Sequence, residues 1–255
     1  MTDAKALPPE EADAGHHRFL AHHFDSPEQQ FYTGKLGMWL FLTTEILFFG
    51  GLFCAYAVYR ANHPDIFVDG HHFLSTALGA TNTAVLIFSS LTMAWSVRSA
   101  QLSRTRGLIA CLVTTLVCAF VFLGIKYVEY AEKMEHGLIP NRIYFERLEP
   151  RLAFEPDEAY LREKLSHYAD PSAAGEDLDL RVRKVRIFFG IYFCMTGLHA
   201  LHVIAGIGVI LWILVRSLKG HFSSAYFGPV DYVGLYWHLV DLIWIYLFPL
   251  LYLIH

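Results

Sequence analysis

The sequence contains five stretches that are long and apolar enough to cross a bilayer, and they restrict the possible folds more than any other feature. They cover residues 36–59, 74–97, 107–128, 187–215 and 232–254. A helix needs about 20 apolar residues to span the hydrocarbon core. The alternation of apolar and polar residues that a membrane barrel requires is absent. Because backbone groups in lipid must bond within their own segment, we predict an all-α membrane bundle of five transmembrane helices.

Charged residues are concentrated outside these stretches. They make up 17% of the chain, compared with about 25% of a soluble domain. We expect a polar N-terminal tail (1–35), transmembrane helices one to three (36–130), a long charged insert (131–186) and transmembrane helices four and five (187–255). The net charge of -4 gives no indication of nucleic-acid binding.

Lysine and arginine residues in the short connections predict the orientation of the chain. The opposite short loop holds Arg60 alone. The positive-inside rule therefore predicts a cytoplasmic N-terminus and an extracytoplasmic C-terminus, with the insert outside. The basic residues on the predicted cytoplasmic side are Lys5, Arg18, Lys35, Arg98, Arg104, Arg106, Arg216 and Lys219.

Several polar side chains fall within the predicted helices, where a buried charge is costly and needs a partner or a purpose. In chain order they are Glu45, Lys126, Glu129, His199, His202, Trp237, His238, Asp241 and Trp244. Three pairs are separated by three residues, namely Lys126–Glu129, His199–His202 and His238–Asp241. Each pair should face one side of its helix. We expect the first and third pairs to bond internally, and the histidine pair to bond to another helix or to contact lipid headgroups.

The spacing of His199 and His202 would also suit a metal or haem, but the remaining ligands are missing. No second pair of histidines or cysteines lies on another stretch at a matching depth. The sequence therefore predicts no metal site in this chain. Glu45 lies inside a run of Phe and Leu residues and has two interpretations: a proton-linked or partner-binding acid, or a protonated acid bonded to a neighbouring helix.

The order of five segments resembles subunit III of the haem–copper oxidases, chiefly cytochrome c oxidase. The segments are KLGMWLFLTTEILFFGGLFCAY (35–56), NTAVLIFSSLTMAWS (82–96), KYVEY (126–130), GLHALHVIAG (197–206) and YWHLVDLIWIYLF (236–248). They follow the order and approximate spacing of that family, and they fall in all five predicted helices.

This resemblance implies an accessory subunit that packs against the catalytic subunit I, alongside subunit II and other oxidase subunits. Haem and copper would lie in those partner subunits, while this chain would bind phospholipid and support proton uptake in aerobic respiration. Glu45 matches the carboxyl-reagent target of mitochondrial relatives. The other eight polar residues would contact lipid, other helices or other subunits.

Two departures from the mitochondrial pattern carry further expectations. Mitochondrial members have seven spans, whereas five spans occur in bacterial members, which implies a bacterial inner membrane. The insert is longer than the corresponding family loop, so residues 131–186 are a candidate docking surface for cytochrome c or for a neighbouring complex.

Other functions stay open at this point. The equivalent subunit of a quinol oxidase or nitric oxide reductase would share these helices. A stand-alone proton-coupled transporter could use Glu45, Asp241 and the histidines, but the inverted repeat and broken helices typical of transporters are absent. A membrane enzyme with a di-histidine metal site lacks the necessary ligands.

Overall fold

The computed structural model describes residues 20–135, 138, 160, 163–165 and 178–254, of which residues 178–183 are described by their backbone alone. Within these residues, five helices are long and apolar enough to cross a membrane, which confirms the predicted fold class. They are α2 (Pro27–Asn62), α4 (Thr76–Gln101), α5 (Thr105–Glu135), α8 (Leu178–Leu218) and α9 (Gly228–Tyr252). The short helix α3 (Pro64–His71) follows α2.

The first transmembrane helix begins earlier than the sequence indicated, inside the segment expected to be a polar tail. The Ser26 side chain accepts a hydrogen bond from the backbone N–H of Gln29 at 3.2 Å, and Pro27 occupies the first helical turn. A serine N-cap followed by proline favours a helix start, because the cap satisfies a free N–H group and proline has none to satisfy.

The predicted insert is shorter than expected at both ends, because helices extend into it. α5 continues to Glu135, and α8 begins at Leu178. Most of the remaining insert, like residues 1–19 of the tail, lies outside the described residues. The described part of the insert packs on the bundle: Leu138 and Leu165 are buried in the core, and the Tyr160 ring lies 6.2 Å from the ring of Phe73.

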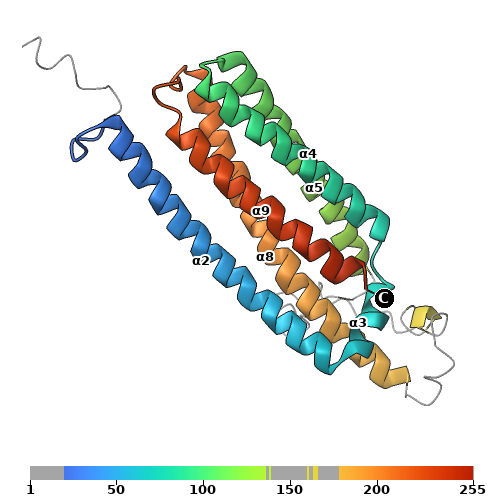
Figure 1. The fold of residues 1–255 in the computed structure, drawn as a ribbon. Helices are drawn as coiled ribbons and strands as arrows, with labels where there is room; N and C mark the ends of the chain where they lie inside the picture. The colour runs from blue at the N-terminus through green and yellow to red at the C-terminus, as the bar shows by residue number, and fades with distance from the viewer. Residues whose placement is uncertain (1–19, 136–137, 139–159, 161–162, 166–177, 255) are drawn as a thin grey trace, which may run out of the picture.

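The long helices alternate in direction, which gives the bundle two distinct ends (Figure 1). α2, α5 and α9 begin at the end hereafter called the N-terminal end, and they finish at the C-terminal end, where α3 lies. α4 and α5 lie side by side, and α9 packs against α4, α8 and α2. Within an apolar stretch of 18 residues taken from each helix, 56% of the residues are buried in α9, compared with 11% in α2. α9 is therefore the central helix and α2 a peripheral one.

The C-terminal end is closed by α3, which packs against α8. Phe67 is fully buried there, and its ring meets the ring of Phe188 at 5.7 Å. Gly70 also faces Phe188, so closely that a Cβ atom would overlap the ring. Lys184 forms an ion pair with Asp65 at the outer edge of this contact. The short helix is thus held by aromatic packing, with the ion pair at its rim.

Candidate functional site

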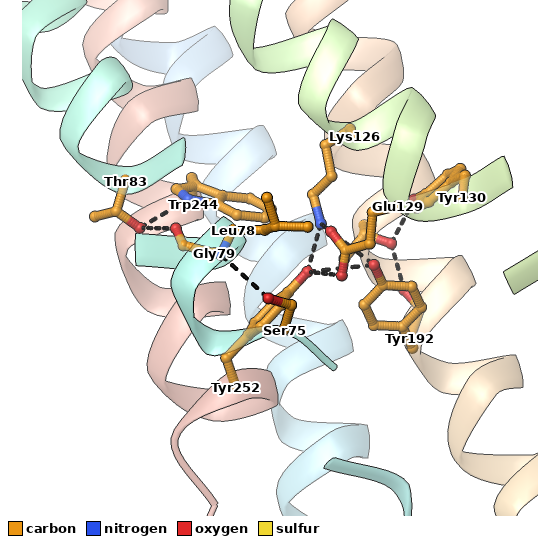
Figure 2. A network of polar contacts seen from close by, with 11 residues as sticks. Ser75, Leu78, Gly79, Thr83, Lys126, Glu129, Tyr130, Tyr192, Trp244 and Tyr252 are labelled. Carbon is orange, nitrogen blue, oxygen red and sulfur yellow. Dashed lines mark hydrogen bonds and ion pairs between the residues drawn. The ribbon is translucent and has the colours of Figure 1, made fainter. Parts of the chain in front are cut away.

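A buried ion pair near the C-terminal end is the centre of a polar network (Figure 2). Lys126 and Glu129 of α5 are 4% and 1% exposed. The Lys126 ammonium donates to Glu129 Oε2 at 2.8 Å, to the Tyr252 hydroxyl at 2.6 Å and to the Tyr192 hydroxyl at 3.2 Å. An ammonium has three donor positions, so all of them are used.

The tyrosine hydroxyls complete the network on the acidic side. Tyr252 donates to Glu129 Oε1 at 2.7 Å. Since its hydrogen is used there, the 3.2 Å contact between the Tyr192 and Tyr252 hydroxyls has Tyr192 as the donor. A charge removed from water needs several hydrogen bonds in addition to its counter-ion. Both charges meet this requirement, and the network joins α5, α8 and α9.

Four aromatic rings surround the Lys126 ammonium. The Trp244 ring is nearest, with its centroid 4.5 Å from Nζ, and the rings of Tyr252, Tyr192 and Tyr130 lie at 5.1, 5.4 and 5.9 Å. A cation within about 6 Å of an aromatic face is attracted by the ring quadrupole, most strongly by tryptophan. The pair at Lys126 thus fixes helix positions by charge, hydrogen bonds and ring contacts together.

A second intramembrane pair connects α2 to α8. Glu45 Oε2 and His202 Nε2 are 2.9 Å apart, and both residues lie in the middle of their helices. The two side chains are 18% and 22% exposed. His202 also binds through Nδ1 to the carbonyl of Leu198 at 2.8 Å. The bond between Glu45 and a neighbouring helix corresponds to one of the two interpretations drawn from the sequence.

His199 and His202 do not share a partner, although three residues separate them. His199 points toward α5 and α9, where its ring meets those of Phe122 at 5.7 Å and Trp244 at 5.4 Å. It is fully buried, and neither ring nitrogen has a hydrogen-bond partner among the described residues. Residues three apart differ by about 60° around a helix, which is enough to direct the two rings at different neighbours.

The predicted internal pair of His238 and Asp241 is not formed. His238 Nδ1 instead lies 2.7 Å from the Ser90 hydroxyl of α4. The Asp241 carboxyl is buried, and its two oxygens have no hydrogen-bond partner within the described part of the chain. The prediction was wrong because the hydroxyl of a neighbouring helix lies within reach of His238, which spacing along one helix does not reveal.

Both tryptophans of α9 donate hydrogen bonds to α4. Trp237 Nε1 donates to the Ser89 hydroxyl at 3.0 Å, and Trp244 Nε1 donates to the Thr83 hydroxyl at 3.1 Å. Both indoles are fully buried. Their N–H groups need a partner in the membrane interior, and α4 supplies one at each level.

A cavity of about 1140 Å³ lies at the N-terminal end, between the start of α2 and the connection from α8 to α9. Its aromatic lining residues are Phe24, Phe31, Tyr32, Tyr226, Phe227 and Tyr232. Tyr232, one of these residues, donates to the carbonyl of Phe31 at 2.8 Å. No group of three or more potential metal ligands occurs among the residues that the structure describes.

The sequence located the ionisable groups but missed the hydroxyl groups that bind them. Nothing in the sequence distinguishes Tyr192, Tyr252 and the Ser and Thr residues of α4 that bind these groups, because such residues are common in membrane helices. One signal was available: a buried lysine needs more acceptors than a single carboxylate provides. Tyr192 of α8 and Tyr252 of α9 are the further acceptors that the structure supplies.

The family model of cytochrome c oxidase subunit III matches residues 19–137 and 185–255. A cytochrome c oxidase subunit 3 of Thermostichus vulcanus is 29% identical over 86% of this chain and 86% of its own length. Another from Synechocystis is 30% identical over 86% of this chain and 74% of its own. A heme-copper oxidase subunit I+III of Aeropyrum pernix is 27% identical, over 86% of this chain and 22% of that protein. The matched residues include α2, α4, α5 and α9 in full and α8 from residue 185 onward. The chain is a multi-pass membrane protein of the cytochrome c oxidase subunit III family.

Proposed function

We propose that this chain is the accessory, redox-centre-free subunit III of a proton-pumping haem–copper oxidase, and that it stabilises the catalytic subunit I. Haem and copper then belong to partner subunits, and electron transfer from cytochrome c takes place there. The proposal places the protein in a bacterial inner membrane, with a cytoplasmic N-terminus and an extracytoplasmic C-terminus, as the distribution of Lys and Arg in the short loops indicates.

The match to the protein named subunit I+III carries the choice of subunit I as the main partner. In that protein, a segment similar to this chain belongs to the same polypeptide as a subunit I. Two subunits joined in one chain are held close together, so a separate chain of the same family is expected to pack against a separate subunit I. Subunit II and the other oxidase subunits would contact the remaining surface.

The lipid-facing surface of α2 supports an accessory role in a larger assembly. This helix exposes large apolar side chains along most of its length, including Trp39, Leu40 and Leu47. Such a surface suits acyl chains or the helices of another subunit. We propose the aromatic cavity at the N-terminal end as a site for bound phospholipid, because tyrosine and tryptophan are enriched where headgroups meet acyl chains.

Glu45 supports a role in proton uptake, because it is an acid in the middle of a membrane helix. Its bond to His202 provides an internal partner for a proton. The insert is proposed to dock cytochrome c or a neighbouring complex. A chain that lacks the insert, yet assembles and turns over cytochrome c normally, would refute that docking role.

Purification through a tag on this chain tests the proposal directly. The complex is extracted in mild detergent, its chains are identified by mass spectrometry, and a reduced-minus-oxidised spectrum is recorded. The proposal predicts haem bands and a catalytic oxidase subunit in stoichiometric amount, with subunit II carrying the copper ligands. A colourless protein that purifies alone, from membranes rich in oxidase, would refute it in favour of a transporter.

A further inference from the structure

The side chains of α2 are covered by the rest of the bundle along one narrow line with a seven-residue repeat. Between residues 36 and 52, Met38, Leu42, Glu45, Phe49 and Leu52 are covered, and every other position is exposed. The spacing alternates between four and three residues, which is the pattern of coiled-coil packing. The complete line, hereafter the α2 seam, consists of Phe31, Lys35, Met38, Leu42, Glu45, Phe49, Leu52, Tyr56 and Tyr59.

The seam ends in polar contacts that differ in strength. At the N-terminal end, Lys35 forms an ion pair with Asp231 at 3.1 Å, with the lysine side chain 37% exposed. At the other end, the buried Tyr56 hydroxyl donates to the carbonyl of Leu250. An exposed ion pair contributes about 0–1 kcal/mol. The Lys35 ion pair alone therefore defines the position of α2 along its own axis only weakly.

Glu45 is the one acidic member of the seam, and it lies at the centre. The carbonyl of Leu198 can only accept a hydrogen bond, so His202 Nδ1 carries a hydrogen. The 2.9 Å contact between His202 Nε2 and Glu45 Oε2 then holds one proton between the two groups. The pair is neutral overall, whichever group carries that proton. A neutral, bonded pair is compatible with the bilayer interior, whereas either group alone is costly there.

We propose that the Glu45–His202 pair sets the axial register of α2 against α8 and α9. A displacement of α2 by one repeat, about 10 Å, would still place apolar residues of the seam at most of its apolar positions. Met38 or Leu52 would then face His202, and Glu45 would lie among apolar side chains without a partner. A single polar residue in a seven-residue repeat is a known way to exclude shifted registers at some cost in stability. Glu45 is thus a positioning residue.

Disulfide crosslinking of the full chain in its native membranes tests this proposal. The four native cysteines, Cys54, Cys111, Cys118 and Cys194, are first replaced by alanine. A cysteine at Tyr246 is then paired with one at Phe53, whose ring lies 6.1 Å from that of Tyr246, to report the native register. Cysteines one repeat away, at Ile46 or Arg60, report α2 displaced in either direction.

Three variants separate the polar pair from a general effect of substitution. With Glu45 intact, we expect the Phe53–Tyr246 crosslink to dominate. Glu45→Leu should raise the shifted crosslinks at least about tenfold relative to the native one, which corresponds to about 1.4 kcal/mol. Glu45→Gln should keep the native pattern, because its amide can donate to His202 Nε2. Thr44→Leu, one residue away on the exposed face, should also leave the pattern unchanged.

The outcomes decide the matter in both directions. Shifted crosslinks in Glu45→Leu, together with a native pattern in Glu45→Gln, support a register set by the hydrogen bond. An unchanged native pattern in Glu45→Leu would overturn the proposal, as would equal shifts in the Leu and Gln variants. A general loss of α2 packing, with low yields at all three positions, would also overturn it, since register alone predicts new crosslinks rather than none.

Discussion

Replacing Lys126 by methionine perturbs the buried ion pair in the most direct way. Methionine keeps much of the side-chain volume, so the change removes the charge without opening a large cavity. Glu129, which is 1% exposed, retains the Tyr252 hydroxyl at 2.7 Å as a hydrogen-bond donor. Breaking a buried pair by removing one partner costs about 3–5 kcal/mol. Because one donor remains, we expect a loss of about 3 kcal/mol in the free energy of unfolding.

The same reasoning predicts that the second substitution restores most of the loss. In the double variant Lys126→Met/Glu129→Met, neither charge of the pair is left buried. The main remaining cost is one tyrosine O–H without an acceptor, about 1 kcal/mol, because the Tyr192 and Tyr252 hydroxyls still contact each other but Glu129 is gone. Steric-trapping unfolding of the full chain in lipid bicelles measures these free energies. Tyr127→Met is the matched control, because Tyr127 is adjacent and 76% exposed. It should change stability by less than about 0.5 kcal/mol.

Two results would refute this account of the pair. A broken buried pair should cost about 3–5 kcal/mol. If the free energy of unfolding of Lys126→Met lies within about 1 kcal/mol of the wild-type value, Glu129 finds compensation elsewhere. A double variant that loses the sum of the two single losses would mean that the groups act independently, because contacting residues should show a coupling energy. In either case, the surrounding rings and hydroxyls would hold α5, α8 and α9 without the charges.

Two further predictions concern packing and pH. Gly206→Ala should destabilise the bundle by about 1–3 kcal/mol, because a Cβ atom at this position would lie 2.8 Å from Cζ3 of Trp237. Gly208→Ala is the control, because a Cβ atom there would meet open space. It should be neutral or slightly stabilising in the same unfolding assay. The hydrogen bond from Lys184 lowers the pKa of Asp65 in the folded chain. This contact therefore stabilises the fold fully at pH values above the pKa of the unfolded carboxyl, about 3.9. The stabilisation is lost as the pH falls through the lower pKa of the folded state. Asp65→Asn should abolish that part of the acid sensitivity, by at most about 1 kcal/mol because the carboxyl is partly exposed, and equal acid sensitivity of the variant would contradict the assignment.

The sequence was sufficient to predict the five long helices, because lipid allows few alternatives to a helix. Their ends were less accessible. α2 begins at Pro27 because of a local cap that lies outside the apolar stretch. α5 and α8 continue into the charged insert because a helix need not end where the membrane does. Hydropathy locates the part of each helix that lies in lipid, and it does not report the polar turns beyond.

The polar contacts were predictable within one helix but not between helices. The i,i+3 spacing of Lys126 and Glu129 correctly indicated a bond, and the same spacing of His238 and Asp241 did not. Glu45 and His202 are 157 residues apart in sequence, so their contact depends on how α2 and α8 are arranged. Spacing gives the distance between side chains of one helix, whereas the choice of partner depends on what the neighbouring helices bring within reach.

A polar residue in a membrane helix indicates an inward face more dependably than it indicates a bond. Leu40 and Leu47 on the exposed side of α2 are as apolar as Leu42 in the seam, so hydrophobicity cannot distinguish the two faces. Glu45 can, because lipid would not accept it, and it lies in the seam. Yet Asp241 is just as firmly inside, and its carboxyl oxygens have no hydrogen-bond partner within the described residues. The cost of exposing a charge to lipid therefore determines which way these helices face, and the neighbouring side chains then determine whether a bond is formed.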